Sequence, residues 1–348
     1  MRQRCVGIAT ILSVLSIGMA LSFPGSSAAD PTLKPVISGL LDRKGMPSSA
    51  YVPRLDGFVV LTTWADLQST AFGPVAEGNA IDRAVAAVRT SPGASHLRLK
   101  LRVLAGVDAP GWAKALGGGP VNVHHGRKVY TLGKFWTPAF GLAYEDLQAK
   151  LAARYDAEPE VAEVVISRCS VLTAEPFLRA VRPDTRTMES MVAGGYSDTA
   201  DEVCQRQEID AHGVWATTRA GLTLDPYDRL LPDATAVQDG AFTEEIMGYC
   251  RRTLGARCVL ENNAVSAPLL LEPYPTMYRA IKERGGPIGY QTRNAQRIGD
   301  WYQALTWSAR QGANHVELNI TYPTYDRAQL QAARVKLKAN PSGDESEG

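Results

Sequence analysis

The sequence predicts an α/β protein built as a single (β/α)8 TIM barrel. Eight segments of strand character follow one another along the chain, and most of them are separated by helical segments. Repeated strand–helix alternation indicates parallel strands, and eight parallel strands suit a closed barrel of about 250 residues. No internal repeat or interdomain linker is visible in the sequence. An open doubly wound sheet is the alternative, but no GxGxxG or GxxxxGK stretch supports it.

The first 29 residues have the features of a signal peptide. Arg2 and Arg4 give a basic start, residues 6–23 are largely apolar, and residues 27–29 (SAA) are small enough for cleavage. A membrane anchor is the alternative, although three serines and a glycine interrupt the apolar run. We therefore expect a secreted, extracellular protein that has no membrane attachment after cleavage.

Cleavage would leave a barrel domain over residues 30–338 and a disordered tail over residues 339–348, which is too small and polar to pack. The full chain has a net charge of +1, and the cleaved segment carries two basic and no acidic residues, so the mature charge would be −1. This balance gives no support for nucleic acid or an anionic membrane as partner. A neutral, hydroxyl-rich substrate such as a carbohydrate is compatible with it, and no cofactor is indicated.

Four of the five cysteines remain after cleavage: Cys169, Cys204, Cys250 and Cys258. An even number in an exported chain predicts two disulfides. Three pairings are possible. We favour Cys169–Cys204 and Cys250–Cys258, because each pair joins sequence neighbours around a strand and its adjacent helix. Four free thiols are the alternative, and no CxxC or HxxxH spacing supports a metal site.

The first half of the chain contains four predicted strands, over residues 34–41, 56–63, 97–105 and 161–166. The first is the weakest, whereas the second and fourth are apolar runs that fit buried strands. The third alternates apolar and basic residues, so one face would carry Arg98, Lys100 and Arg102. Helices are predicted over residues 80–89, which Asn79 can cap, and over residues 144–155. Residues 117–137 form a long loop with two adjacent histidines, His124 and His125.

The second half repeats the alternation. Strands are predicted over residues 215–224, 256–260, 287–292 and 314–321. Helices are predicted over residues 198–212, 243–254, 274–284, 300–311 and 327–338. Polar residues directly follow most of these strands, which is where a parallel barrel places its reactive groups.

Two of these strand ends carry specific motifs. A helix ending in Arg154-Tyr155 leads into the fourth strand, which is followed by Ala174-Glu175-Pro176, and the second strand ends in TWADLQ (63–68). These segments resemble those of retaining (β/α)8 glycoside hydrolases, whose usual forms are NEP and W-x-x-L-E-P. The resemblance implies a glycosidase with Glu175 as its acid/base.

The same resemblance places a nucleophile after the seventh strand, and there the sequence departs from the family. That strand ends in Gln291, a neutral amide that cannot attack a sugar carbon. Ala174 and Gln68 also replace the usual asparagine and glutamate. Glycosidic cleavage needs two carboxyl groups, so another acidic residue has to supply the second.

Glu317 is the best replacement. A period of two in the last strand puts His315, Glu317 and Asn319 on one face, and the apolar residues between them on the other. The polar face should point into the barrel, where a carboxylate is costly unless it is paired or functional. Glu317 would then be the nucleophile or base. The alternative is a structural carboxylate bonded to Arg102 or another barrel arginine.

The remaining candidates are expected to bind substrate, because they lie at strand ends or offer flat rings to the apolar face of a sugar. They are Trp64, Asp108, Trp112, Trp136, Glu261, Asn262, Gln291, His315 and Asn319. The alternative function is a non-catalytic carbohydrate-binding barrel that has lost its nucleophile. A sugar lyase or transferase would use similar residues, whereas no G-x-S-x-G elbow supports a serine hydrolase.

Overall fold

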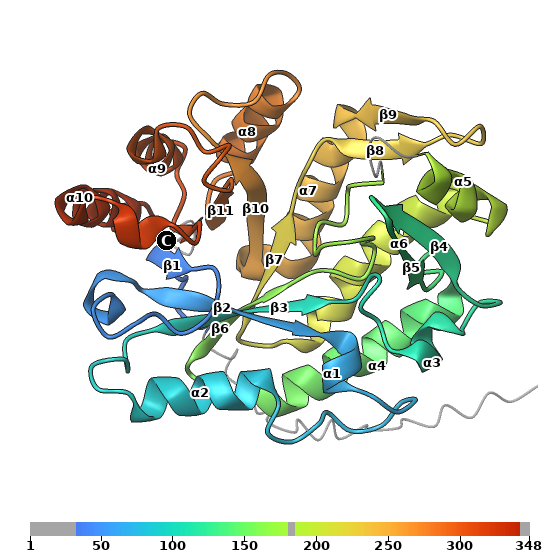
Figure 1. The fold of residues 1–348 in the computed structure, drawn as a ribbon, viewed down its shortest axis with the longest axis horizontal. Coiled ribbons are helices and arrows are strands. Elements are labelled where there is room, and N and C mark those ends of the chain that lie inside the picture. The colour runs from blue at the N-terminus through green and yellow to red at the C-terminus, as the bar shows by residue number, and fades with distance from the viewer. Residues whose placement is uncertain (1–32, 180–184, 342–348) are drawn as a thin grey trace, which may run out of the picture. The chain divides into compact units, whose positions relative to one another are not determined.

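The computed structural model describes residues 33–179 and 185–341, and these form a closed barrel of eight parallel strands (Figure 1). The strands are β1 (Gly39–Asp42), β2 (Gly57–Thr63), β3 (Arg98–Leu104), β6 (Val161–Val165), β7 (Arg219–Thr223), β10 (Cys258–Val265), β11 (Ile288–Thr292) and β12 (His315–Leu318). Around the barrel their order is β1-β12-β11-β10-β7-β6-β3-β2. The predicted fold class is confirmed. The predicted signal peptide and residues 342–348 of the predicted tail lie outside the described residues.

Helices follow the strands, and most of them pack on the outside of the barrel. They are α1 (Trp64–Leu67), α2 (Ala80–Thr90), α3 (Gly111–Lys114), α4 (Pro138–Tyr155), α5 (Arg186–Ala193), α6 (Asp198–Ala211), α7 (Gly240–Leu254), α8 (Tyr274–Glu283), α9 (Trp301–Arg310) and α10 (Arg327–Lys338). Asn79 caps α2 as predicted, and its side chain accepts hydrogen bonds from the first turn. None of the described helices combines the length and the apolar character needed to cross a membrane.

All eight predicted strands overlap strands of the barrel, but some bounds differ. The predicted strand over residues 215–224 begins only at Arg219. The reason is Asp156, whose carboxylate accepts hydrogen bonds from the backbone N–H groups of Ala216, Thr217 and Thr218 and so holds them outside the sheet. The sixth strand is longer than predicted, because the chain continues past Asn262 through an irregularity to Val265.

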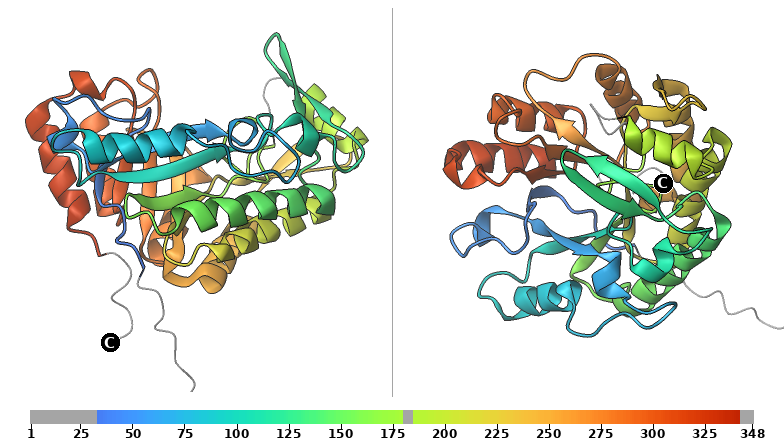
Figure 2. Two further views of the ribbon diagram at one scale, coloured as in Figure 1. Left: turned by 90° about the horizontal axis from the view of Figure 1, so that it is seen from below. Right: turned by 45° about the vertical axis from the view of Figure 1, so that its right-hand side comes forward.

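The predicted loop over residues 117–137 contains an antiparallel hairpin, β4 (Val121–His125) with β5 (Lys128–Leu132), so His124 and His125 lie in a strand. Two side chains of α5 bond to the backbone of β4. The hydroxyl groups of Ser190 and Thr187 accept hydrogen bonds from backbone N–H groups of this strand. Figure 2 shows this hairpin standing out from the barrel. A second hairpin, β8 (Tyr227–Leu230) with β9 (Ala236–Asp239), follows β7. Figure 1 shows β4 and β5 at the right of the view, near α5, and β8 and β9 above α7.

The hydrophobic core lies mainly between the strands and the surrounding helices. One large cluster joins β2, β3 and β6 to α2 and α4, and a second joins β7, β10, β11 and β12 to α7–α10. Barrel interiors are ordinarily filled by layers of branched aliphatic side chains. Here Ile37, Leu41 and Ala162 form only a small separate cluster, and charged side chains take much of the remaining interior.

The two favoured disulfides are present. Cys169 pairs with Cys204 at a Cα–Cα distance of 6.1 Å, and Cys250 pairs with Cys258 at 5.9 Å. Both distances lie within the range for a disulfide. The first links the segment after β6 to α6, and the second links α7 to β10. Disulfides of this kind are typical of proteins that fold in an oxidising compartment.

Candidate functional site

The inner surface of the barrel carries a cluster of buried charged residues, which we call the core charge cluster. It consists of Lys100 and Arg102 on β3, Glu163 on β6, Glu261 on β10, and His315 and Glu317 on β12. Each residue is at most 7 % exposed. Along β3 and β12 these residues are two apart, as the period of a strand requires for side chains on one face. The predicted inward orientation of His315 and Glu317 matches this arrangement.

Lys100 is at the centre of the cluster. Its Nζ lies 2.9 Å from Glu163 Oε1 and 2.9 Å from Glu317 Oε1, and it is also paired with Glu261. The ring of His315 lies beside this group, with Nε2 3.4 Å from both Lys100 Nζ and Glu261 Oε1. One ammonium therefore holds three carboxylates from three different strands.

Two glycines and an irregular strand make room for these side chains. A Cβ at Gly221 would lie 2.9 Å from the Glu261 carboxyl group, and one at Gly289 would collide with the ring of His315. The pairing of β3 with β6 shifts register between Leu99 and Lys100, and this shift turns Glu163 toward Lys100. Such irregularities re-aim side chains next to functional sites.

The charged groups of the cluster shift one another's pKa values. Burial favours the neutral amine of Lys100, but the charges of the three carboxylates outweigh it and raise its pKa. Burial would also raise the pKa of Glu261, yet Lys100 and His315 lower it strongly. Burial, followed by the negative charge of Glu261, raises the pKa of Glu163 to about 7. Three carboxylates around two cations leave one of them, Glu163, ready to take up a proton near neutral pH.

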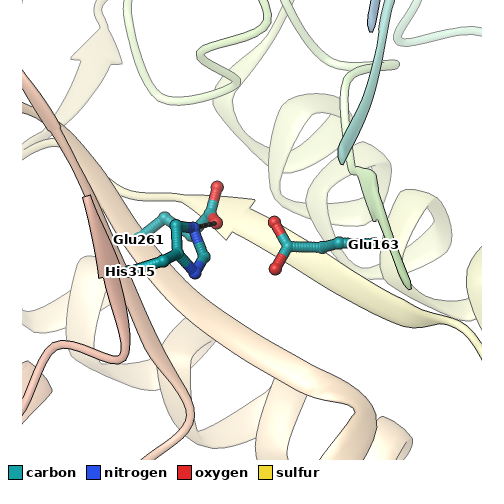
Figure 3. A group of neighbouring side chains, drawn as sticks. All are labelled: Glu163, Glu261 and His315. Atoms are coloured by element: carbon teal, nitrogen blue, oxygen red, sulfur yellow. Dashed lines mark ion pairs between the residues drawn. The ribbon is translucent and has the colours of Figure 1, made fainter. Parts of the chain in front are cut away.

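Glu163, Glu261 and His315 have ligand atoms within 4.8 Å of one another, which is a geometry that can hold a metal ion. Figure 3 shows the three side chains converging. The ammonium of Lys100 already forms ion pairs with both carboxylates, however, and it supplies the positive charge that a metal would bring. We therefore regard this group as an ion-paired cluster and not as a metal site.

Glu317 lies one layer nearer the carboxyl ends of the strands than His315. Arg102 Nη2 donates to Glu317 Oε1 at 2.7 Å, and Arg102 Nη1 donates to Gln291 Oε1 at 3.2 Å. Burial would raise the pKa of Glu317, but the charges of Arg102 and Lys100 outweigh it and lower the pKa. Its second oxygen, Oε2, is buried and has no hydrogen-bond partner among the described residues. Glu317 is thus an ionised carboxylate with one unbonded oxygen.

The barrel is accessible to solvent beside this pair. Leu61 of β2 lies directly beside Arg102 in the paired strands β2 and β3. Its neighbour Val60 packs in the core between the barrel and the helices, and successive side chains of a strand point to opposite faces. Leu61 therefore faces the interior, yet it is 55 % exposed. Solvent reaches the barrel at the level of Arg102.

Glu175 follows β6 at the same end of the barrel and is half-buried. Its Oε2 accepts a hydrogen bond from the Thr173 hydroxyl at 2.6 Å. Its negative charge acts on Arg102, whose pKa it helps to raise, and on Asp225 after β7. Glu175 is therefore within electrostatic range of both Arg102 and Asp225.

Asp225 is 3 % exposed. Its Oδ1 accepts from the Tyr274 hydroxyl at 3.3 Å and from Asn262 Nδ2 at 3.4 Å. Burial, followed by the charge of Glu175, raises the pKa of Asp225 well above its usual range. Asn262, a predicted substrate-binding residue, is fully engaged here, since it also donates to Leu224 O and accepts from the Tyr278 hydroxyl.

The three tryptophans predicted to bind substrate do not offer their rings to a ligand. Trp64 is 0 % exposed and Trp136 is 7 % exposed, and both pack in the core with no ring face open to a ligand. The half-buried Trp112 donates to Gln68 O and packs on Trp64 and Phe72. Trp64 and Trp112 belong to the short helices α1 and α3, whereas Trp136 precedes α4 and packs on Phe135 and Tyr196. We therefore leave the three tryptophans out of the site.

The four remaining predicted residues have clear positions. Asp108 is half-buried beside Lys114, and burial raises the pKa of its carboxyl group. Asn319 is buried and donates to the Tyr325 hydroxyl at 2.6 Å. Glu261 and His315 belong to the core charge cluster, one layer below Glu317.

The sequence arguments missed two members of this arrangement, Glu163 and Tyr274. A signal for Glu163 existed, because it is the single charged residue in the apolar run over residues 161–166. A charge inside a buried strand has to be paired or functional. Tyr274 gave no such signal, since it is one of 13 tyrosines and starts an ordinary amphipathic helix.

No protein-family model and no curated protein sequence matches the chain. Among solved structures, the catalytic domain of the β-amylase from Paenibacillus polymyxa is similar with a TM-score of 0.53 and 9 % identity, over 86 % of this chain and 96 % of that one. The chain shares the barrel fold of that domain. Endo-glycoceramidase II from Rhodococcus sp. has a TM-score of 0.48 at 14 % identity, over 83 % of this chain and 75 % of that one. Morphinone reductase has a TM-score of 0.47 at 16 % identity, over 89 % and 91 %. At such identities similarity defines the fold, and function has to be argued from the site.

Proposed function

We propose that the protein is a glycoside hydrolase that cleaves an O-glycosidic bond at the carboxyl end of its barrel. Glu175 is the acid/base and Glu317 is the nucleophile or the base that activates water. A carbohydrate is the substrate, and the reaction requires no cofactor. Glycosidic cleavage requires one carboxyl group that donates a proton and one that is ionised, and the residues at this end of the barrel provide for both roles.

The observation that carries the proposal is the environment of Glu317. Arg102 and Lys100 lower its pKa, so it is ionised at neutral pH, and its Oε2 has no hydrogen-bond partner among the described residues. A carboxylate in this state can attack a sugar carbon or take a proton from water. Glu175 is close enough to act on Arg102, the cation that holds Glu317.

In the reaction, Glu175 gives its proton to the glycosidic oxygen while the bond between that oxygen and the anomeric carbon breaks, and the bonding electrons remain with the oxygen. Glu317 forms a bond to the anomeric carbon, or removes a proton from the water that does so. In the first case Glu175 then deprotonates the water that releases the sugar. Arg102 donates to both Gln291 and Glu317 and so holds Glu317 in place.

A second candidate is a non-catalytic carbohydrate-binding barrel. It is favoured by the burial of Glu317, whose side chain is 1 % exposed and whose Oε1 is occupied by two cations. In that case Glu317 would be structural, and the residues at the mouth would only bind sugar. Binding of oligosaccharides without any turnover would identify this function.

The test is a comparison of wild type and Glu175→Gln on glycosides that differ in their leaving group. With an alkyl leaving group, which needs a proton, we expect Glu175→Gln to lower kcat/KM by about 10²- to 10⁴-fold, the usual contribution of a general acid. With an activated dinitrophenyl glycoside the loss should be much smaller, because that leaving group departs without a proton.

Glu189→Gln is the matched control, since Glu189 is an exposed glutamate that also accepts a hydrogen bond from a nearby threonine, at 2.7 Å. It should leave both rates unchanged. Equal rates for wild type and Glu175→Gln on the alkyl glycoside would remove Glu175 from the mechanism.

We also propose that the protein is secreted, with residues 1–29 removed as a signal peptide, a barrel domain over residues 30–338 and a disordered tail. The two disulfides support export, because such bonds persist in oxidising compartments. The mass of the protein recovered from the culture medium should correspond to a chain that begins at Asp30. A mature chain that retains residues 1–29 would contradict this proposal.

A further inference from the structure

Arg43 is a charged residue at the mouth of the barrel that the proposed mechanism does not use. Leu41 of β1 lies directly beside Glu317 in the paired strands β1 and β12, so the two share the inner face of the barrel. Arg43 follows Leu41 by two residues, and its Nη1 donates to Thr292 O at the end of β11 at 3.2 Å. Because β12 lies between β1 and β11, the side chain of Arg43 crosses over β12. Its guanidinium group therefore lies beyond Glu317, toward the carboxyl ends of the strands.

The charge of Arg43 is not balanced by an ion pair with any described residue. Its hydrogen bond goes to a backbone carbonyl group, and no acidic side chain in the described part of the chain pairs with it. The preceding residue, Asp42, instead accepts hydrogen bonds from the Tyr322 hydroxyl at 2.6 Å and from Lys44 N at 2.7 Å. Charged groups that are partly removed from water are ordinarily paired, so Arg43 departs from the usual pattern.

The neighbouring Arg102 shows the contrast. Its Nη1 donates to Gln291, also on β11, and its Nη2 bonds to Glu317 at 2.7 Å. Burial would lower the pKa of Arg102, but the charge of Glu317 outweighs it and raises the pKa. Burial also lowers the pKa of Arg43, and there Glu317 does not outweigh it. Glu317 is already paired with Arg102 and Lys100, and Arg43 is a third positive charge beside it.

A ligand can reach this positive charge from solution. Arg43 is partly exposed, and solvent enters the barrel at Leu61, which lies beside Arg102. An anion that enters the mouth meets Arg43 without having to displace a carboxylate of the protein. The planar fork of a guanidinium group can donate two parallel hydrogen bonds to the oxygens of such an anion.

We propose that Arg43 binds an anionic group of the substrate, so that the sugar next to the cleaved bond is acidic and carries a carboxylate or a sulfate group. This inference rests on the proposed function and names its substrate class. Arg43 contributes binding and specificity, while bond cleavage remains with Glu175 and Glu317. The near-zero charge of the whole chain does not oppose this inference, because recognition depends on the charges at the site.

Calorimetric binding of matched oligosaccharides tests the proposal. Oligomers of glucuronic or galacturonic acid are compared with their methyl esters, and sulfated oligosaccharides with their desulfated forms, so that the charge is what differs within each pair. All proteins in this comparison carry Glu175→Gln, which keeps the ligand intact. We expect an acidic ligand to bind about 10- to 100-fold more tightly than its neutral counterpart, the usual effect of a hydrogen bond to a charged group. The pair that shows the difference identifies the anion as carboxylate or sulfate.

Adding Arg43→Gln should abolish this difference, because the amide can still donate to Thr292 O but has no charge. The affinity for the neutral ligand should stay the same, which shows that the site is still folded. Arg43→Lys keeps a positive charge and should retain part of the difference. Arg98→Gln is the matched control, since Arg98 is a half-buried arginine at the opposite end of the barrel that donates to the backbone carbonyls of Ser95 and Leu97. It should leave the difference intact.

Equal affinity for acidic and neutral ligands before Arg43 is changed, or a preference for acidic ligands that persists in Arg43→Gln, would overturn the proposal. Failure of the glycosidase function looks different. If acidic ligands bind through Arg43 and the protein with Glu175 intact cleaves none of them, the binding role stands and cleavage is what fails. If that protein cleaves neutral oligosaccharides and shows no preference for acidic ones, the glycosidase stands and the acidic substrate class fails.

Discussion

Replacing Lys100 by methionine is expected to destabilise the protein by about 3–5 kcal/mol at pH 7, the usual effect of removing one partner of a buried ion pair. Methionine has nearly the same length as lysine but no charge. Glu163 and Glu261 would then lose their ammonium partner, and Glu317 would keep only Arg102. Urea unfolding followed by circular dichroism would measure the change in the free energy of unfolding.

Lys150→Met is the matched control. Lys150 pairs with Asp146 one turn away on α4, and both side chains are about a third exposed or less, at 30 % and 27 %. A pair of this kind contributes about 0.3–0.5 kcal/mol. If Lys100→Met were no more destabilising than Lys150→Met, the ammonium would not be holding the carboxylates together.

The pH dependence of Lys100→Met provides a further check. Without the ammonium, the buried carboxyl groups have raised pKa values in the folded state, so the folded protein binds more protons than the unfolded one. Stability is then greatest at low pH and falls as the pH rises through those values. The loss in free energy of unfolding of Lys100→Met relative to wild type should therefore be smaller at pH 5 than at pH 7. The double variant Lys100→Met/Glu163→Gln should recover part of this loss, because one charge fewer is left buried.

The fold could be predicted from the sequence because each element has a local signal. Eight apolar or alternating runs gave the strands, and Asn79 marked the start of α2. The differences come from contacts that local patterns do not contain. Asp156 shortens β7 from a distance of about 60 residues in sequence, with hydrogen bonds to Ala216, Thr217 and Thr218.

The site was predictable in part for the same reason. The period of β12 placed Glu317 and His315 on the inner face, and the structure pairs Glu317 with Arg102, a partner already considered from the sequence. The position of Lys100 among three carboxylates depends on the shift of register in β6, which no pattern in one strand reveals. The long-range placement of Tyr274 beside Asp225 was equally inaccessible.

These contacts also bear on what the core charge cluster does. Buried ion pairs are weak evidence for stability, since well-packed apolar side chains often serve as well or better. The cluster does provide one thing that an apolar interior would not, which is a pair of cations that keep Glu317 ionised. We infer that Lys100 and Arg102 maintain the charge of Glu317, and that the carboxylates below balance the excess positive charge.

Replacing Glu317 by glutamine is accordingly expected to lower kcat by roughly 10⁴- to 10⁶-fold, the range found when a nucleophile or its direct partner is removed. Glutamine keeps the size of the side chain and an oxygen that Arg102 can bond, so the fold should persist, but the amide cannot attack carbon or accept a proton from water. Steady-state kinetics and thermal unfolding, measured on the same samples, separate loss of chemistry from loss of structure.

Glu163→Gln is the matched control, because it removes another buried carboxylate that contacts Lys100 without touching the mouth of the barrel. It should retain activity. Glu317→Ala adds a sharper readout. The space left beside Arg102 and Lys100 would attract a small anion, so azide should restore part of the turnover if Glu317 is the nucleophile. A Glu317→Gln enzyme within about 10-fold of the wild-type rate, about 1.4 kcal/mol in the barrier, would show instead that Glu317 only balances the charges of Arg102 and Lys100.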